Sequence, residues 1–375
     1  MLGKKTTENR IDLLRSLMIF GVVILHTPPY IPIAAIGSAP FDLIVAFFQH
    51  AVFRTTVPVL TCISGYLLFR ASLDLQPLRL LQKKCSSIVI PFLVFNLSLV
   101  AAFLLIRAYT GVSVGSTTIE TTGEWLDATL GLTAEPLNYP LNFLRDLIPI
   151  FMLAPLMGWF LRKSIWAGLI LILLVFAFNL DGSFILRNAM LPVFYVGGMA
   201  AVQKWDVGIL DCYAAALLAL FLGICACIVY FHIANTTYLQ LTAPLLIWPA
   251  ASLLATTALG AWLARMSKYS YFLFLAHAPV LLLVSMIHKK YLSSIPFPIY
   301  WIATPLIVTC IVIAVYKLAM QLSPNTFNAM IGNSQRRARA STTNVPERRK
   351  AARPADAPIY TPEFRMTLRQ INSAM

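Results

Sequence analysis

Residues 16–30 read SLMIFGVVILHTPPY, and this stretch decides what kind of fold the chain can adopt. Nine apolar or small residues run from Leu17 to Leu25, directly after Arg15. His26 follows the run, and two prolines close behind it should end a helix there, because proline donates no backbone hydrogen bond. The pattern predicts a membrane helix with an arginine at one end and a histidine at the other.

The whole chain has the composition of a membrane protein. Of its 375 residues, 59% are hydrophobic and 12% are charged, and the mean hydropathy is +0.76, whereas a soluble domain carries about a quarter charged residues. A helix satisfies its own backbone in lipid, and about 20 apolar residues cross a bilayer. We therefore predict an all-α membrane protein, a bundle of about ten transmembrane helices at 11–29, 41–68, 86–107, 143–161, 165–180, 189–203, 212–232, 241–263, 270–288 and 297–320.

The distribution of basic residues predicts the orientation of this bundle, since cytoplasmic loops are enriched in Lys and Arg. With ten spans and a cytoplasmic N-terminus, most basic loops fall on the cytoplasmic side. The acidic loop 108–142 then falls outside. Both termini are therefore expected in the cytoplasm.

The chain divides by composition into a transmembrane domain, 1–322, and a basic tail, 323–375, which is expected to be cytoplasmic and disordered. Residues 333–375 hold nine Lys and Arg against three Asp and Glu, and so carry much of the net charge of +14. Anionic membrane lipid is the expected partner of this tail, and no motif indicates nucleic acid. The six cysteines form no CxxC pair, so no metal site is expected.

Arg15 and His26 are the first candidates for function, because ionisable groups inside a membrane are costly and usually functional. They are eleven positions apart, so they share one helix face and lie about 16 Å apart along its axis. A structural interpretation stays open for both. Arg15 would then anchor the helix at the interface, and His26 would be a hydrogen-bonded interior histidine.

The second candidate stretch is FRTTVPVLTCISGYLLFR, residues 53–70. Arg54 is expected near the outer end of its helix, at a depth close to that of His26. A break is expected near Pro58. The small pair Ser64 and Gly65 permits the close approach of another helix or of a ligand.

Three further stretches place charged or titratable residues beside apolar segments. YPLNFLRDLIPI (139–150) contains Arg145 and Asp146, which either form a salt bridge at a helix start or aim an arginine at an anionic group. MSKYSYFLFLAHAPVLL (266–282) puts a histidine, His277, about two turns into its apolar segment. The basic pair in KKCSSIVIPF (83–92) precedes the third segment, and it consists of Lys83 and Lys84.

Taken together, these stretches resemble the acyltransferase-3 family of membrane acyltransferases. Arg15, ten residues and His26 match the first-helix signature, and RTTVPVLTCISGYLL is similar to the second-helix pattern. NFLRDLIPIFMLAPL resembles the W-F-L-R-D-L segment, with Asn142 in place of tryptophan. YSYFLFLAHAPVL resembles the S-Y-x-x-Y-L-x-H-x-P segment. The matches span residues 10–282 in the expected order.

The resemblance implies transfer of an acyl group from cytoplasmic acyl-CoA to a hydroxyl of an extracytoplasmic or lipid-linked glycan. Exopolysaccharide synthesis at the bacterial inner membrane is the expected setting, with succinyl or acetyl as the acyl group. Acyl-CoA, for example succinyl-CoA, would be a co-substrate, and no bound cofactor is expected.

The expected roles follow from this chemistry. His26 would be the general base, and Arg15 would bind the donor's phosphates, since guanidinium pairs bidentately with phosphate. The remaining candidates are Lys83 and Lys84 beside the donor, Arg54 and Arg145 at an oxyanion or acyl carboxylate, His277 as a second proton carrier or supporting residue, and Ser64, Gly65 and Asp146 as supporting residues.

Two other functions stay open. A glycan transporter or flippase would also use buried arginine and histidine, but it would not consume acyl-CoA. A non-catalytic subunit of a polysaccharide-synthesis complex would tolerate His26→Ala. No internal repeat of the kind common in transporters is visible in the sequence.

Overall fold

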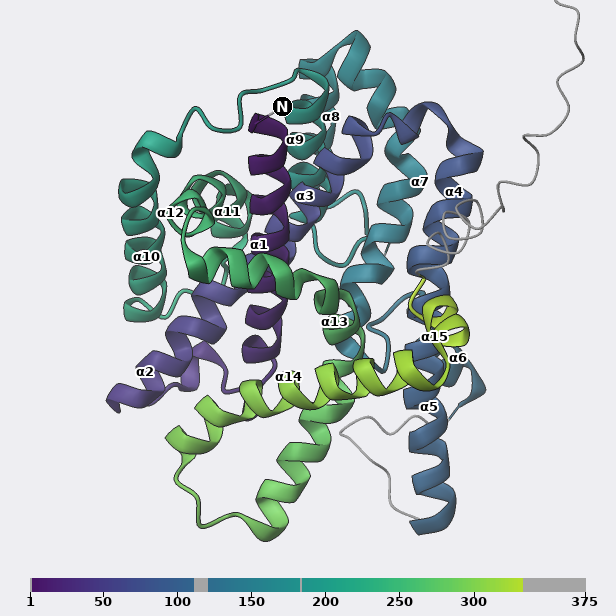
Figure 1. The fold of residues 1–375 in the computed structure, drawn as a ribbon, viewed down its shortest axis with the longest axis vertical. Coiled ribbons are helices and arrows are strands. Elements are labelled where there is room, and N and C mark those ends of the chain that lie inside the picture. The colour runs from purple at the N-terminus through teal and green to yellow at the C-terminus, as the bar shows by residue number, and fades with distance from the viewer. Residues whose placement is uncertain (1, 111–120, 183, 333–375) are drawn as a thin grey trace, which may run out of the picture. The chain divides into compact units, whose positions relative to one another are not determined.

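A computed structural model describes residues 2–110, 121–182 and 184–332 (Figure 1). Within these ranges the regular structure is entirely helical, which confirms the predicted all-α class. The α-helices are α1 (Leu2–Leu25), α2 (Pro40–Ala46), α3 (Thr56–Arg70), α4 (Pro77–Lys84), α5 (Ile90–Thr110), α6 (Thr122–Leu130), α7 (Asn142–Lys163), α8 (Ile165–Ala177), α9 (Met190–Val202), α10 (Ala214–Tyr230), α11 (Thr237–Ala250), α12 (Ser252–Ala255), α13 (Ala258–Tyr291), α14 (Phe297–Leu322) and α15 (Pro324–Met330).

Seven helical segments of the described chain are long and apolar enough to cross a membrane: Pro40–Arg70, Pro77–Tyr109, Tyr139–Lys163, Asp211–Tyr230, Thr237–Ala255, Ala258–Tyr291 and Phe297–Leu322. The predicted fifth and sixth spans correspond to the shorter apolar helices α8 and α9. The predicted first span corresponds to α1, which also carries charged residues. The protein is thus a multi-span helical membrane protein, while the number ten and the orientation stay predictions.

The break in the second predicted span lies before Pro58. A π-helical turn, Phe47–Ala51, and a 3-10 turn, Val52–Thr55, separate α2 from α3. Pro58 is the third residue of α3, where a backbone N–H has no partner within the helix in any case. The proline is therefore accommodated in the first turn. The chain changes direction in the irregular turns before it, and Arg54 lies in the second of them.

Two other boundaries differ from the sequence prediction. The predicted span 241–263 ends early, because α11 stops at Ala250, and the helix that follows α12 runs without a break from Ala258 to Tyr291. The predicted outer loop contains α6, which begins with a capping box: Thr121 accepts from the N–H of Glu124, and the Glu124 carboxylate accepts from the N–H of Thr121.

The start of the predicted tail is helical. Phe327 of α15 is buried and lies 5.0 Å from Phe272 of α13, measured between ring centroids. Residues 333–375, the rest of the predicted tail, lie outside the described residues.

Helix α1 lies near the middle of the view in Figure 1, with α10, α11 and α12 to its left and α4 and α7 to its right. It packs against α13 and α3, and α3 packs against α9 along most of their lengths. A Cβ at Gly65 of α3 would overlap the carbonyl oxygen of Phe194 in α9, and one at Gly197 of α9 would overlap that of Cys62. The two backbones are therefore in direct contact, as small residues allow in membrane helices.

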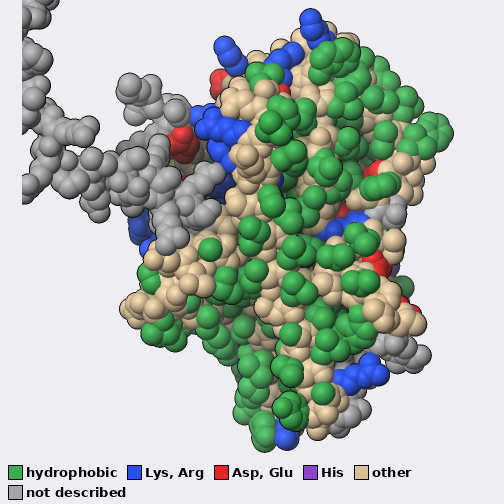
Figure 2. All heavy atoms as spheres, turned by 90° about the vertical axis from the view of Figure 1, so that its right-hand side faces the viewer, with side chains coloured by type: hydrophobic (Ala, Val, Ile, Leu, Met, Phe, Trp, Pro, Cys, Tyr) green, Lys and Arg blue, Asp and Glu red, His purple; other side chains and the backbone are tan. Residues whose placement is uncertain are grey.

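The outer surface is apolar. Figure 2 shows hydrophobic side chains over much of one face, with Lys and Arg side chains at its upper end and a few more at its middle and lower end. This distribution suits a surface that faces lipid with basic groups near the headgroups.

Candidate active site

The two histidines predicted as candidates meet in the structure. His26 follows the last residue of α1, and its backbone N–H donates to the carbonyl of Val22 at 3.2 Å. His277 is fully buried in α13. Nδ1 of His26 lies 3.2 Å from Nε2 of His277, and the two rings stack with centroids 5.5 Å apart and planes at 15°. The packing of α1 on α13 therefore builds a histidine pair.

The surroundings of His277 determine which nitrogens carry hydrogen. Nδ1 of His277 lies 2.8 Å from the carbonyl oxygen of Phe274 and 3.1 Å from that of Leu273. A carbonyl oxygen only accepts, so Nδ1 of His277 is the donor, and in the neutral ring Nε2 is then an acceptor. Nδ1 of His26 must donate to it. In the neutral pair, Nε2 of His26 is therefore left with a free lone pair, as a general base requires.

His26 lines a cavity of about 300 Å³, which we call the polar cavity. His277 lies behind His26 and does not line it. The apolar part of the wall comes from Val22, Leu25, Val57, Pro140, Leu186, Ala189 and Phe274. The polar part comes from His26, Arg54, Thr56, Arg187, Asn188, Thr237 and Gln240. Histidine and arginine thus face one small space.

Arg54 is held at the wall of the polar cavity by a chain of hydrogen bonds. Its Nη2 donates to the hydroxyl of Tyr30, and its guanidinium lies over the Tyr30 ring, 5.5 Å from the centroid. The Tyr30 hydroxyl is 3.3 Å from Nδ1 of His50, whose Nε2 donates to the carbonyl of Ile31 at 2.7 Å. None of these contacts neutralises the charge of Arg54.

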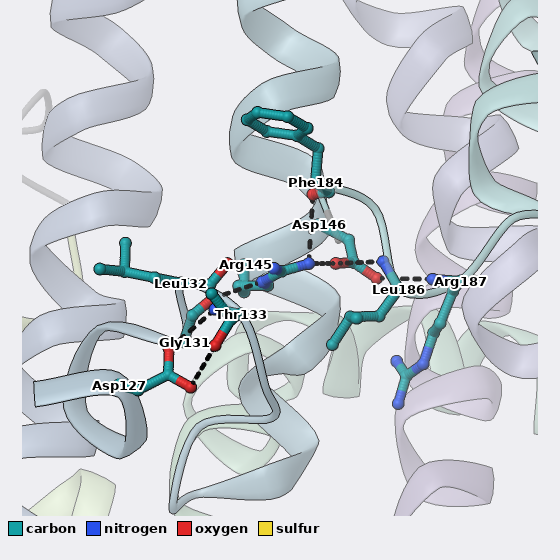
Figure 3. Close-up of polar contacts among 9 residues, drawn as sticks. All are labelled: Asp127, Gly131, Leu132, Thr133, Arg145, Asp146, Phe184, Leu186 and Arg187. Atoms are coloured by element: carbon teal, nitrogen blue, oxygen red, sulfur yellow. Dashed lines mark hydrogen bonds and ion pairs between the residues drawn. The ribbon is translucent and has the colours of Figure 1, made fainter. Parts of the chain in front are cut away.

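Arg145 is buried outside the polar cavity and holds loops together (Figure 3). Its Nε donates to the carbonyl of Gly131 at 2.6 Å, and Nη2 donates to that of Leu132 at 2.9 Å. Its Nη1 donates to the carbonyl of Phe184 at 3.1 Å and to Oδ1 of Asp146 at 2.8 Å. The structure therefore joins the predicted pair Arg145 and Asp146 as a salt bridge near the start of α7.

Asp146 connects this salt bridge to the polar cavity. Its two carboxylate oxygens accept from the backbone N–H groups of Leu186 and Arg187, each at 3.2 Å. The Arg187 side chain lines the cavity, and Figure 3 shows its guanidinium apart from the Asp146 carboxylate. Burial lowers the pKa of Arg187, and the attraction of Asp146 and Glu135 opposes this. The group stays a cation at neutral pH.

The sequence prediction missed Arg187 as a site residue. Its place in the chain carries no local motif, and it counted only as one of the few basic residues expected in loops on the outer side. Asn188, Thr237 and Gln240 were missed for the same reason, since they lie in loops or at helix starts. An arginine directly before an apolar segment was the only available signal.

The cations expected at the donor lie about three turns before His26, near the middle of α1, because the helix begins at Leu2 and not near residue 11 as predicted. Arg15 has an exposed fraction of 43% for its side chain, and its Nη1 is 3.7 Å from Oδ1 of Asp12. Nζ of Lys84 lies 3.9 Å from the ring centroid of Phe151, within electrostatic range of both Arg15 and Lys83. These three cations therefore form one group, eleven residues or about 16 Å of helix away from His26.

Comparison with known proteins gives two findings. Residues 8–317 match the acyltransferase domain that defines the acyltransferase-3 family. The chain is also 30% identical over 377 residues to the succinoglycan biosynthesis protein ExoH of Rhizobium meliloti (strain 1021), a match that covers 95% of this chain and 98% of the relative. No solved structure matches the chain.

Proposed function

The chain belongs to the acyltransferase-3 family of integral membrane proteins, and from this membership we propose that it moves an acyl group, succinyl or acetyl, from cytoplasmic acyl-CoA to a glycan hydroxyl. The acceptor is an extracytoplasmic or lipid-linked glycan of exopolysaccharide synthesis. The name of the relative, a succinoglycan biosynthesis protein, supports this setting. The observation that carries the proposal is the histidine pair at the polar cavity, because it leaves Nε2 of His26 free as a base.

The reaction uses His26 twice. Its Nε2 takes the proton of the acceptor hydroxyl while the oxygen attacks the thioester carbonyl. The tetrahedral intermediate then expels the CoA sulfur, which takes that proton back from Nε2. His277 is a positioning residue, since it accepts from Nδ1 of His26 and so keeps the lone pair on the opposite nitrogen. General-base assistance of this kind contributes about 10²–10⁴ in rate.

Arg54 is suited to stabilise the oxyanion, because it lines the same cavity as His26 and carries a charge that Tyr30 does not neutralise. Arg145 receives a different role from the one expected. Its donors bind loop carbonyls and Asp146, so we assign it to positioning, together with Asp146. Ser64 and Gly65 serve the packing of α3; the Ser64 hydroxyl donates to the carbonyl of Leu60.

Arg15, Lys83 and Lys84 are assigned to the phosphates of the donor. Their grouping around Arg15, near the middle of α1, supports this assignment, since phosphate recognition calls for clustered cations. The donor's flexible thioester arm must then extend along α1 to reach His26. This arrangement requires the N-terminus of α1 to lie on the cytoplasmic side of the bacterial inner membrane, with ten spans and a cytoplasmic C-terminal tail.

The experiment is acyl transfer by the purified full-length chain in lipid nanodiscs, with labelled acyl-CoA and the lipid-linked glycan of the producing cell. We expect a glycan mass increase of one acyl group, with release of free CoA, for the wild type and loss of both for His26→Ala. Movement of glycan across a membrane without consumption of acyl-CoA would instead support a transporter. Transfer that persists in His26→Ala would support a non-catalytic role for this residue.

A further inference from the structure

We propose that Arg54 and Arg187 together form a carboxylate-binding site in the polar cavity, beside the reacting nitrogen of His26. The inference rests on the proposed function and adds a substrate class to it: one of the two substrates carries an acid group close to the reacting atoms. Arg54 and Arg187 lie within electrostatic range of each other, and both line the cavity.

Neither of these two arginines makes an ion pair with a carboxylate among the described residues. Among the described residues, ion pairs join Arg10 to Asp211, Arg15 to Asp12, Arg70 to Glu8, Arg145 to Asp146 and Arg162 to Asp74. No such pair involves Arg54 or Arg187 in this part of the chain, and no aspartate or glutamate of it lines the polar cavity. Asp146 and Glu135 both attract Arg187. Glu135 is exposed and does not line the cavity, and the carboxylate of Asp146 is already bound by Arg145 and two backbone N–H groups.

Cations in a small cavity are costly unless an anion joins them. The helix ends add to the positive potential. α3 and α9 both begin at the cavity, since Thr56 and Val57 at the start of α3 and Asn188 and Ala189 just before α9 line it. The N-terminal end of a helix carries a partial positive charge and favours anions. Arginines and helix ends therefore select a negative ligand.

The guanidinium of Arg54 and the backbone of Arg187 are held before any ligand arrives. Arg54 is fixed through Tyr30 and His50, and the backbone of Arg187 is fixed through Asp146. Guanidinium matches a carboxylate in a bidentate geometry, and a preformed site loses less entropy on binding. A volume of about 300 Å³ is at the small end of ligand pockets, so the acid belongs to a small group.

The carboxylate can come from two sources. It is either the free end of a dicarboxylic acyl group such as succinyl, or an acid substituent on the acceptor sugar. The chemistry that Arg54 and Arg187 recognise is the same in both cases. The two sources differ in which substrate loses affinity when an arginine is removed.

The test compares Arg54→Gln and Arg187→Gln with Lys289→Gln, which removes an exposed charge at the end of α13. KM and kcat are measured with succinyl-CoA and acetyl-CoA, each with acid-bearing and acid-free acceptor glycan. If the acid is on the acyl group, each arginine variant raises KM for succinyl-CoA roughly 10- to 100-fold more than KM for acetyl-CoA. Arg54→Gln also lowers kcat with both donors, because it removes the cation at the oxyanion. If the acid is on the acceptor, the same rise appears for the acid-bearing glycan with both donors. Arg187→Lys should recover part of the loss.

A second measurement does not depend on activity. Succinate should raise the Tm of the wild type and of Lys289→Gln, succinamide should not, and neither should act on the double variant of Arg54 and Arg187. Equal changes in KM for all substrates, or a succinate response that the double variant keeps, would overturn the carboxylate site. A wild type that transfers no acyl group but responds to succinate in this way would instead refute the proposed reaction and leave the site intact.

Discussion

Nδ1 of His26 and Nε2 of His277 lie 3.2 Å apart although 251 residues separate them in the chain. The contact makes the two histidines unequal. His277 is anchored to backbone carbonyls of its own helix, while His26 reaches the polar cavity. His277 orients the ring of His26, and His26 is free to react. Many catalytic bases are oriented in this way by a neighbouring group.

The first prediction concerns the different roles of His26 and His277. His26→Ala should lower kcat by about 10²–10⁴, because it removes the base, whereas His277→Ala should cost less, because the base remains but is no longer oriented. Acceptor acylation by purified variants, with acyl-CoA binding followed separately, checks this. If His26→Ala transfers near the wild-type rate while His277→Ala is inactive, the base has been assigned to the wrong histidine.

Donor binding gives the second prediction. Arg15→Ala should raise KM for acyl-CoA more than Arg15→Lys, because lysine keeps the charge but loses the bidentate fork. Arg265→Gln is a suitable control, since Arg265 is exposed on α13. Equal, near-wild-type KM values for both Arg15 variants would leave Arg15 as an interfacial anchor only.

The Arg145–Asp146 salt bridge should matter for stability as well as for activity. Asp146→Asn leaves the buried Arg145 without its counter-charge, which typically costs about 3–5 kcal/mol. We expect a lower Tm in detergent and, at temperatures where the variant stays folded, a higher KM for the acid-bearing substrate, because Arg187 loses its anchor. An unchanged KM for that substrate would show that the salt bridge does not affect binding in the polar cavity.

Glycine substitutions test the contact of α3 with α9. Gly65→Ala should destabilise the protein by about 1–3 kcal/mol, because the added methyl group meets the carbonyl of Phe194. Gly223→Ala in α10 is the matched control: nothing lies within 4 Å of its Cβ, and alanine is the better helix former. In thermal unfolding in detergent, Gly65→Ala should have a lower Tm than the wild type and Gly223→Ala a higher one. Equal Tm values for the two variants would contradict the backbone contact.

The orientation can be tested directly. Reporter fusions at positions 125 and 340 should report opposite sides of the membrane, because the basic loops lie toward one side. Signals from the same side would contradict ten spans with both termini in the cytoplasm.

The sequence predicted those features that depend on local pattern. Apolar runs predicted the helical class. The prediction of Arg15 and His26 at the two ends of one helix was half right: His26 follows the last residue of α1, but the helix begins at Leu2, so Arg15 lies near its middle. The pairing of His26 with His277 was not predictable, since periodicity within a segment does not say which segments pack together. Arg187 was missed for a related reason: its importance comes from Asp146, which is 41 positions away and shares no motif with it.

A break near Pro58 was predicted, and the irregular turns Phe47–Ala51 and Val52–Thr55 end three residues before it. Pro58 itself lies in the first turn of α3, where proline is tolerated. The sequence pattern did not show that the turns place Arg54 directly before α3.

The contact of Gly65 with the backbone of α9 also fixes the backbone positions from which Arg54 and Arg187 reach the polar cavity. Arg54 precedes the first turn of α3 by two residues, and Arg187 precedes α9 by three. Two helices in backbone contact cannot slide past each other without a clash, so the gap between the two arginines is set by the main chain. In the proposed site, both arginines therefore reach one carboxylate from fixed backbone positions, so acids of different lengths would be held by the same end.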